Sequence, residues 1–166
     1  MQTPSLFSRG NLSLRPARPS DQAFIESLYR STRDDLQLID AKRDFIETLI
    51  DQQHHAQTLG YSEQFPDAVY FIVEVQQQRI GKVSIDFNHN EIHIIDLSLI
   101  PAARGKGYGA QVIKALKKAS SSVCTPLVLN VYKSNSVAKQ LYQTEGFKVT
   151  RSDQMIDSMI WYPSYS

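Results

Sequence analysis

Hydrophobic residues recur along the chain at two spacings, three or four positions apart in some stretches and every second position in others. The first spacing is typical of one face of a helix and the second is typical of a strand. Helical spacing marks four stretches, which begin after Pro19, near Ala41, after Gly109 and after Asn135. Strand patterns mark seven stretches, at residues 12–15, 69–75, 80–87, 91–99, 127–131, 147–151 and 155–162.

The order of these stretches predicts the fold class. One strand is followed by two helices, three strands, a helix, a strand, a helix and two strands. Because each element has to bury its apolar side against another layer, this order predicts an α/β (α+β) fold, a mixed sheet with helices on both faces. The second helix is expected over residues 41–58, since Gly60 and Pro66 break its pattern, and residues 36–40 are expected to connect the first two helices.

The strand pattern at residues 91–99 changes phase. Ile92 and Ile94 are apolar at even positions, whereas Leu97 and Leu99 are apolar at odd positions. Because side chains alternate along a strand, the change indicates one extra residue, a β-bulge near residues 94–95. Glu91, His93, Asp96 and Ser98 would then share one face of the strand. A strand buried on both faces, where alternation is not required, is the alternative interpretation.

A glycine-rich turn lies between this strand and the following helix. Residues 104–109 read Arg-Gly-Lys-Gly-Tyr-Gly. Such a turn exposes unpaired backbone N–H groups at a helix start, where the helix dipole also favours negative charge, and the pattern therefore predicts a phosphate or pyrophosphate site. The spacing matches neither the P-loop nor the Gly-x-Gly-x-x-Gly turn of dinucleotide folds.

Charge is distributed unevenly along the chain. Residues 97–144 contain seven Lys or Arg and no Asp or Glu, while the rest of the chain has 11 basic against 17 acidic residues. This asymmetry suggests that one region meets a polyanion, either a phosphorylated cofactor or a nucleic acid. A solvated helix face is the alternative for Lys114, Lys117 and Lys118. The acidic remainder and the lack of clustered aromatic residues beside the lysines argue against nucleic acid.

Length and composition are those of an ordinary globular protein. A chain of 166 residues predicts a single domain over residues 1–166 with a sizeable core. No apolar run is long enough to cross a bilayer, and the N-terminus lacks the charged-then-apolar pattern of a signal peptide, so we expect a cytoplasmic protein without a membrane partner. The single cysteine, Cys124, excludes a disulfide framework or a cysteine-rich metal site, and no metal is expected.

Two motifs together resemble those of the GNAT superfamily of N-acyltransferases. The turn at residues 104–109 matches the Arg/Gln-x-x-Gly-x-Gly/Ala loop that binds the pyrophosphate of acyl-CoA in that superfamily. Residues 135–147 match its second motif, Asn-x-x-Ala-x-x-Leu-Tyr-x-x-x-Gly-Phe. The resemblance covers residues 12–162, is strongest over residues 92–147, and includes the order of elements.

The resemblance implies a seven-stranded, mostly antiparallel sheet with splayed central strands, and acetyl-CoA as co-substrate. It assigns the pyrophosphate to the residues of the loop, and the pantetheine arm and thioester carbonyl to the backbone of the bulged strand, with a further contact from the start of the last helix. The residues so assigned are Arg104, Gly105, Lys106, Gly107, Tyr108 and Gly109 in the loop, Leu97, Ser98 and Leu99 in the strand, and Asn135, which also suits a helix cap.

The resemblance also implies the catalytic groups. Tyr142 falls on the tyrosine that points at the CoA sulfur and is the candidate acid for the departing thiolate; a core tyrosine is the alternative. His93 falls where several members place a general base, and histidine titrates in a suitable range. Asp96 is the second candidate base. A structural His93, with an amine that arrives already neutral, remains open.

The activity implied is transfer of an acetyl group from acetyl-CoA to a primary amine by direct attack. The acceptor is a small-molecule or a peptide or protein amine, bound in a groove lined by the first two helices, their connection at residues 32–40, and a late strand. The alternative is a GNAT-fold module that binds CoA as a sensor or structural ligand without turnover. The resemblance leaves a homodimer open.

Overall fold

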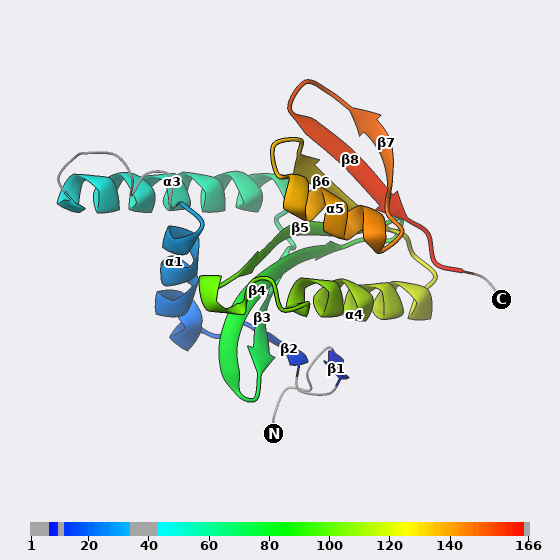
Figure 1. Ribbon diagram of the computed structural model, residues 1–166, viewed down its shortest axis with the longest axis horizontal. Helices are drawn as coiled ribbons and strands as arrows, with labels where there is room; N and C mark the ends of the chain where they lie inside the picture. The colour runs from blue at the N-terminus through cyan, green and yellow to red at the C-terminus, as the bar shows by residue number, and fades with distance from the viewer. Residues whose placement is uncertain (1–6, 10–11, 34–42, 165–166) are drawn as a thin grey trace.

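The computed structural model describes residues 7–9, 12–33 and 43–164. Its strands form one sheet in the order β1-β2-β3-β4-β5-β6-β8-β7, and every neighbouring pair is antiparallel except β5 with β6 (Figure 1). The strands are β1 Phe7–Arg9, β2 Leu12–Pro16, β3 Val69–Val75, β4 Gln78–Phe87, β5 Ile92–Leu99, β6 Leu127–Tyr132, β7 Lys148–Ser152 and β8 Ile156–Trp161.

Both faces of the sheet are covered by helices. The helices are α1 Gln22–Ser31, α3 Arg43–Gln64, α4 Tyr108–Ser122 and α5 Ser136–Thr144. The main core joins α4 and α5 to one face, where Leu14, Phe71 and Val73 point. Ile72, between Phe71 and Val73 in β3, points to the other face of the sheet and is also fully buried. This is the face on which α1 contacts β4 and β5. The predicted fold class is confirmed.

Three local features differ from the predictions. The sheet contains the seven expected strands, β2 to β8, and also β1, which no sequence pattern had indicated. The predicted end of the second helix was wrong: α3 continues through Gly60, which is exposed and open on its Cβ side, and ends at Gln64 before Pro66. Val137 was expected on the apolar stripe of α5, but its side chain is 80% exposed. The predicted connection at residues 36–40 lies outside the described residues.

The predicted bulge in β5 is confirmed. Ile94 pairs with Ile85 and Asp96 pairs with Ser84, so Ile95 is the extra residue. Because directly opposite residues of a strand pair point to the same face, His93 and Asp96 share the face that is turned away from the main core. A bulge bends its strand and increases its twist.

β5 and β6 separate just beyond the bulge. They pair in parallel over only three positions, from Ile92 opposite Leu127 to Ile94 opposite Leu129. The rest of β5, up to Leu99, keeps its hydrogen bonds to β4, but no strand among the described residues pairs with it on the side of β6. The central strands are therefore splayed, and one edge of β5 is left with unpaired backbone groups.

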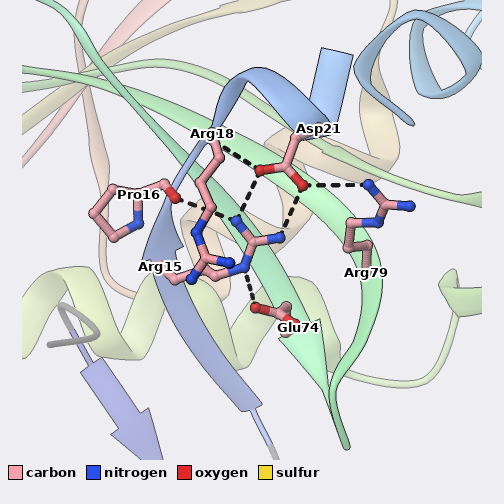
Figure 2. A network of polar contacts seen from close by, with 6 residues as sticks. All are labelled: Arg15, Pro16, Arg18, Asp21, Glu74 and Arg79. Atoms are coloured by element: carbon pink, nitrogen blue, oxygen red, sulfur yellow. Dashed lines mark hydrogen bonds and ion pairs between the residues drawn. The ribbon is translucent and has the colours of Figure 1, made fainter. Parts of the chain in front are cut away.

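A buried ion network holds the start of α1 against the sheet. Figure 2 shows the Arg15 guanidinium between the carboxyl groups of Asp21 and Glu74, with Arg79 also directed at Asp21. Arg15 donates to both Asp21 oxygens at 2.7 and 2.8 Å. The Asp21 side chain is 1% exposed, and Arg15 holds the pKa of its carboxyl well below the usual range. The network fixes where α1 begins.

We expect Asp21 to stabilise the fold at neutral pH and to lose that effect in acid. A carboxyl whose pKa is lowered by folding contributes fully above the unfolded value of about 3.9, and loses this contribution as pH falls toward the folded value. Asp21→Asn should therefore lower the free energy of unfolding at pH 7 by roughly 2 kcal/mol and flatten the loss of stability below about pH 4.

Urea titrations of the wild type and of Asp21→Asn, at pH 7 and below about pH 4, measure this change in the free energy of unfolding. The control is Asp51→Asn, which removes an exposed carboxylate paired with Arg30 and should change the free energy of unfolding by less than about 1 kcal/mol. An Asp21→Asn variant as stable as the wild type at pH 7 would contradict this role of the network.

Candidate active site

The glycine-rich turn forms an open cradle of backbone N–H groups. Gly107 caps α4 with φ +84°, and Gly105 has φ +72°, a region in which glycine is unstrained. The N–H groups of residues 105–110 have no acceptor in the described part of the chain. The N–H groups on either side of this row do: Arg104 N donates to the Pro101 carbonyl, and Gln111 N donates to the Gly107 carbonyl. A Cβ added at Gly105 or Gly107 would meet only open space. The cradle therefore suits a large anion.

The third glycine of the turn serves a different purpose. A Cβ at Gly109 would lie 3.2 Å from Cδ2 of Leu141, so a residue without a side chain lets α4 approach α5 closely. Arg104 stabilises the other end of the turn, where its Nε donates to the Leu99 carbonyl at 3.0 Å. The loop is thus fixed against both α5 and the end of β5.

Part of the positive charge of residues 97–144 is paired with carboxylates of the fold. Lys114 and Lys117 contact Glu145, and Lys133 and Lys139 contact Asp157, two acids that follow the segment in the sequence. Within the described residues, Arg104 and Lys106 make no ion pair. Four of the lysines in this segment therefore stabilise the fold through ion pairs. The cations that remain available to a bound anion include Arg104 and Lys106 in the glycine-rich turn.

A cleft of about 300 Å³ lies beside the unpaired part of β5. It brings together many of the predicted site residues with others from α1, α3 and β4 and with Thr32, which begins the connection that was expected to line the acceptor groove. The predicted ones are Asp96, Leu97, Ser98, Leu99, Arg104 and Asn135, and the others are Ile25, Leu28, Tyr29, Thr32, Gln57 and Lys82. The strand, the turn and the last helix thus meet at one cavity.

Asp96 is the only acid among the described residues that line this cleft. Its carboxylate lies 3.6 Å from Lys82 Nζ, and Ser98 Oγ approaches both of its oxygens at 3.4 Å. Lys82 was not predicted as a site residue; the only signal in the sequence was its polar position within the strand pattern at residues 80–87. The cleft therefore carries a paired, partly exposed carboxylate on the strand itself.

Asn135 serves as a helix cap and also faces the cleft. Its side-chain oxygen accepts from Ala138 N at 3.2 Å at the start of α5. The amide NH₂ group makes no hydrogen bond within the described part of the chain, so it remains able to donate to a bound molecule. The two roles considered for Asn135 from the sequence are compatible.

Tyr142 lies in the core beside the cleft and is not part of the cleft lining. It is 9% exposed, and its ring packs 5.8 Å from that of Phe147. Burial, with a contribution from Asp96, raises the pKa of Tyr142 to about 12. Its hydroxyl is therefore protonated at neutral pH, and it makes no hydrogen bond within the described residues.

His93 is placed apart from this cleft. Its half-buried ring packs 4.7 Å from that of Phe65, just beyond the end of α3, and it lines a second cavity. Burial lowers the pKa of His93, and the nearby carboxylates of Glu91 and Asp86 oppose this only in part. The imidazole is therefore neutral at pH 7. The structure puts His93 and Asp96 on one face of β5 but in two neighbouring cavities.

Other candidate chemistry is sparse in the described ranges. Residues 7–9, 12–33 and 43–164 contain no group of three or more His, Cys, Asp or Glu side chains arranged to hold a metal ion. Cys124 is exposed at the end of α4. None of the described helices is both long enough and apolar enough to span a membrane.

Comparison with known proteins gives a family match. Residues 22–147 match the model of the acetyltransferase (GNAT) family. A stretch of 61 residues is 39% identical to a Bacillus subtilis (strain 168) protein named uncharacterized N-acetyltransferase YycN. That stretch covers 36% of this chain and 39% of the relative, so the match spans well under half of the relative's length.

Solved structures of N-acetyltransferases share the fold. PaiA N-acetyltransferase from Thermoplasma acidophilum, in complex with coenzyme A, matches 91% of this chain and 98% of its own at a TM-score of 0.68 and 20% identity. Spermidine N-acetyltransferase from Vibrio cholerae, in complex with CoA and spermine, matches 92% of this chain and 95% of its own, at a TM-score of 0.62 and 20% identity. A Salmonella typhimurium acetyltransferase that modifies the N-terminal serine of a ribosomal protein matches 94% of this chain and 97% of its own, at a TM-score of 0.65 and 14% identity.

Proposed function

This chain belongs to the acetyltransferase (GNAT) family, and from that premise we propose that it transfers an acetyl group from acetyl-CoA to a primary amine by direct attack. The observation that carries the proposal is the cradle of free N–H groups at residues 105–110, which opens beside the unpaired edge of β5. Anion binding and backbone hydrogen bonding are thereby available next to each other. Acetyl-CoA needs both, for its pyrophosphate and for its pantetheine arm.

The residues of this chain divide the binding between them. The N–H groups of residues 105–110, with Arg104 and Lys106, bind the pyrophosphate. The free edge of β5 at residues 97–99 and the Asn135 amide bind the pantetheine arm and the thioester carbonyl. Bound there, acetyl-CoA supplies an activated acyl carbon. Backbone donors that point at the carbonyl oxygen stabilise the negative charge that develops on it during attack.

The protons of the reaction are moved by Tyr142 and His93. As the amine nitrogen bonds to the carbonyl carbon, the carbon–sulfur bond breaks, and the sulfur takes a proton from the Tyr142 hydroxyl. The amine proton passes, through water, to the neutral imidazole of His93. Asp96 lines the cleft and attracts the incoming ammonium by its charge. Asp96, whose carboxylate is paired with Lys82, is the second candidate base.

The pH dependence of kcat/KM separates His93 from a mechanism without a protein base. Because burial lowers the pKa of His93, the activity that depends on it should rise with pH through a value below 6.5. An amine acceptor that has to lose its own proton contributes a second rise, near its own much higher pKa. His93→Gln should lower kcat/KM about tenfold and remove the lower limb while leaving the upper one.

Asp96→Asn is the comparison for this experiment. It should raise KM for the amine through the loss of charge and keep the lower limb in place. A His93→Gln profile that matches the wild type in height and shape would make His93 structural.

Thiol release tests the proposed activity itself. A free-thiol reagent should report CoA formation that requires an amine and saturates with amine concentration. Tight acetyl-CoA binding without amine-dependent release would instead favour a module that binds CoA without turnover.

A further inference from the structure

The second cavity lies next to the cleft along α3 and β5. It measures about 240 Å³ and lies under the last two turns of α3, at the point where β5 and β6 separate. Gln57 lines the cleft, and Tyr61 and Gln64, four and seven positions further along the same face of α3, line the second cavity. On β5, Ile95 and Asp96 are consecutive and line one cavity each.

The wall of the second cavity combines aromatic and aliphatic side chains with neutral polar ones. Tyr61, Phe65 and Tyr132 contribute rings, and Ile95 and Ile156 contribute alkyl groups. Its polar members are the neutral side chains of Gln64, Asn130 and His93, and no described residue of the wall carries a carboxylate. A second ammonium group placed there would exchange water for neutral side chains, with no carboxylate in the wall to contact, whereas an apolar group would gain from leaving water.

Asp96 lies close to the boundary between the two cavities. Its carboxylate contributes to the raised pKa of Tyr61, which burial brings to about 12, and to that of Tyr142 beside the cleft. The charge of Asp96 thus acts on a residue of the second cavity as well as on one beside the cleft. A molecule with one positively charged end and one apolar end can therefore place its charge near Asp96 and its apolar end among the rings.

We propose that the second cavity binds the apolar body of the acceptor, and that the acceptor is a monoamine carrying an aryl or short alkyl group rather than a polyamine. The proposal rests on the acetyl transfer proposed above. A cavity of this size takes a group of about one ring. The amine nitrogen then lies near Asp96, at the bulge of β5.

A series of amines tests the proposal through their rates of acetylation. We expect kcat/KM to rise at least tenfold from ethylamine through butylamine and hexylamine to phenethylamine, because each buried methylene adds to binding. 1,4-Diaminobutane should be at least tenfold poorer than butylamine. A flat series, or a preference for the diamine, would overturn the proposal while leaving the acetyl transfer intact.

Two variants show whether the second cavity is responsible. Phe65→Ala should lower the ratio of kcat/KM for phenethylamine to kcat/KM for ethylamine at least fivefold. The matched control is Phe87→Ala, which truncates a 42% exposed phenylalanine on the face of the sheet opposite to His93 and should not change this ratio. Asn130→Asp replaces an exposed amide with a carboxylate of nearly the same shape. This variant should raise the rate with 1,4-diaminobutane relative to the rate with butylamine. Unchanged selectivity in both variants would place the acceptor elsewhere.

A binding measurement keeps the two proposals distinguishable. If no amine releases thiol although acetyl-CoA binds, the acetyl transfer fails, and calorimetry of phenethylamine with the wild type and with Phe65→Ala decides on the cavity. Binding at least fivefold weaker in the variant supports the apolar site. Equal binding, or none to the wild type, overturns it.

Discussion

Gly107→Asp should abolish measurable acetyl-CoA binding in a folded protein, with an affinity loss of at least a hundredfold. Gly107 lies at the centre of the row of free N–H groups at residues 105–110 and is the N-cap of α4. An aspartate there places a negative charge where the pyrophosphate should bind, and its carboxylate can itself occupy the N–H groups. Calorimetric titration with acetyl-CoA measures the effect.

Gly107→Asn is the matched control for this variant. Both side chains tolerate a positive φ better than most, and a Cβ at this position meets no atom within 4 Å, so both variants should fold. Asparagine has the shape of aspartate without its charge, and it should weaken binding far less. Equal affinity of the aspartate variant and the wild type would remove the pyrophosphate from this loop.

Tyr142→Phe should lower kcat by about 10- to 1000-fold and leave the affinity for acetyl-CoA nearly unchanged. The substitution removes only the hydroxyl, which makes no hydrogen bond within the described residues, and keeps the ring against Phe147. With its pKa raised to about 12, the phenol holds its proton at neutral pH. A thiolate released into the same apolar surroundings is also more basic than in water, so it can accept that proton.

Steady-state kinetics with an accepted amine, together with single-turnover measurements, decide the role of Tyr142. Single turnover isolates the chemical step from product release. A variant that keeps the wild-type rate for the chemical step would make Tyr142 a core residue that supports α5 and nothing more. Thermal unfolding of the same variant shows whether packing was preserved.

Some of the site was predictable because it depends on short-range patterns. The phase change between Ile94 and Leu97 indicated the bulge, since strand alternation is a local geometric rule. The glycines at 105 and 107 indicated an unusual backbone at a helix start, and both have positive φ. In each case the physical cause lies within a few residues of the signal.

Other features depend on contacts between distant segments and left no local signal. The extension of α3 past Gly60 brings Phe65 over His93, and this separates His93 from Asp96 into two cavities although both lie on one face of β5. The pairing of four lysines with Glu145 and Asp157 likewise depends on how α4, α5 and β8 pack. Charge counts along the chain therefore overstated the cations available to a ligand.

The most direct test of the central claim is the stoichiometry of the reaction. Acetyl-CoA with a labelled acetyl group is mixed with the protein and phenethylamine or another accepted amine. Free thiol is counted while mass spectrometry identifies the product. We predict one thiol for each amine that carries the label on its nitrogen, and neither product with Gly107→Asp. Thiol release that is independent of the amine, with the label recovered as free acetate, would contradict transfer to nitrogen by this protein.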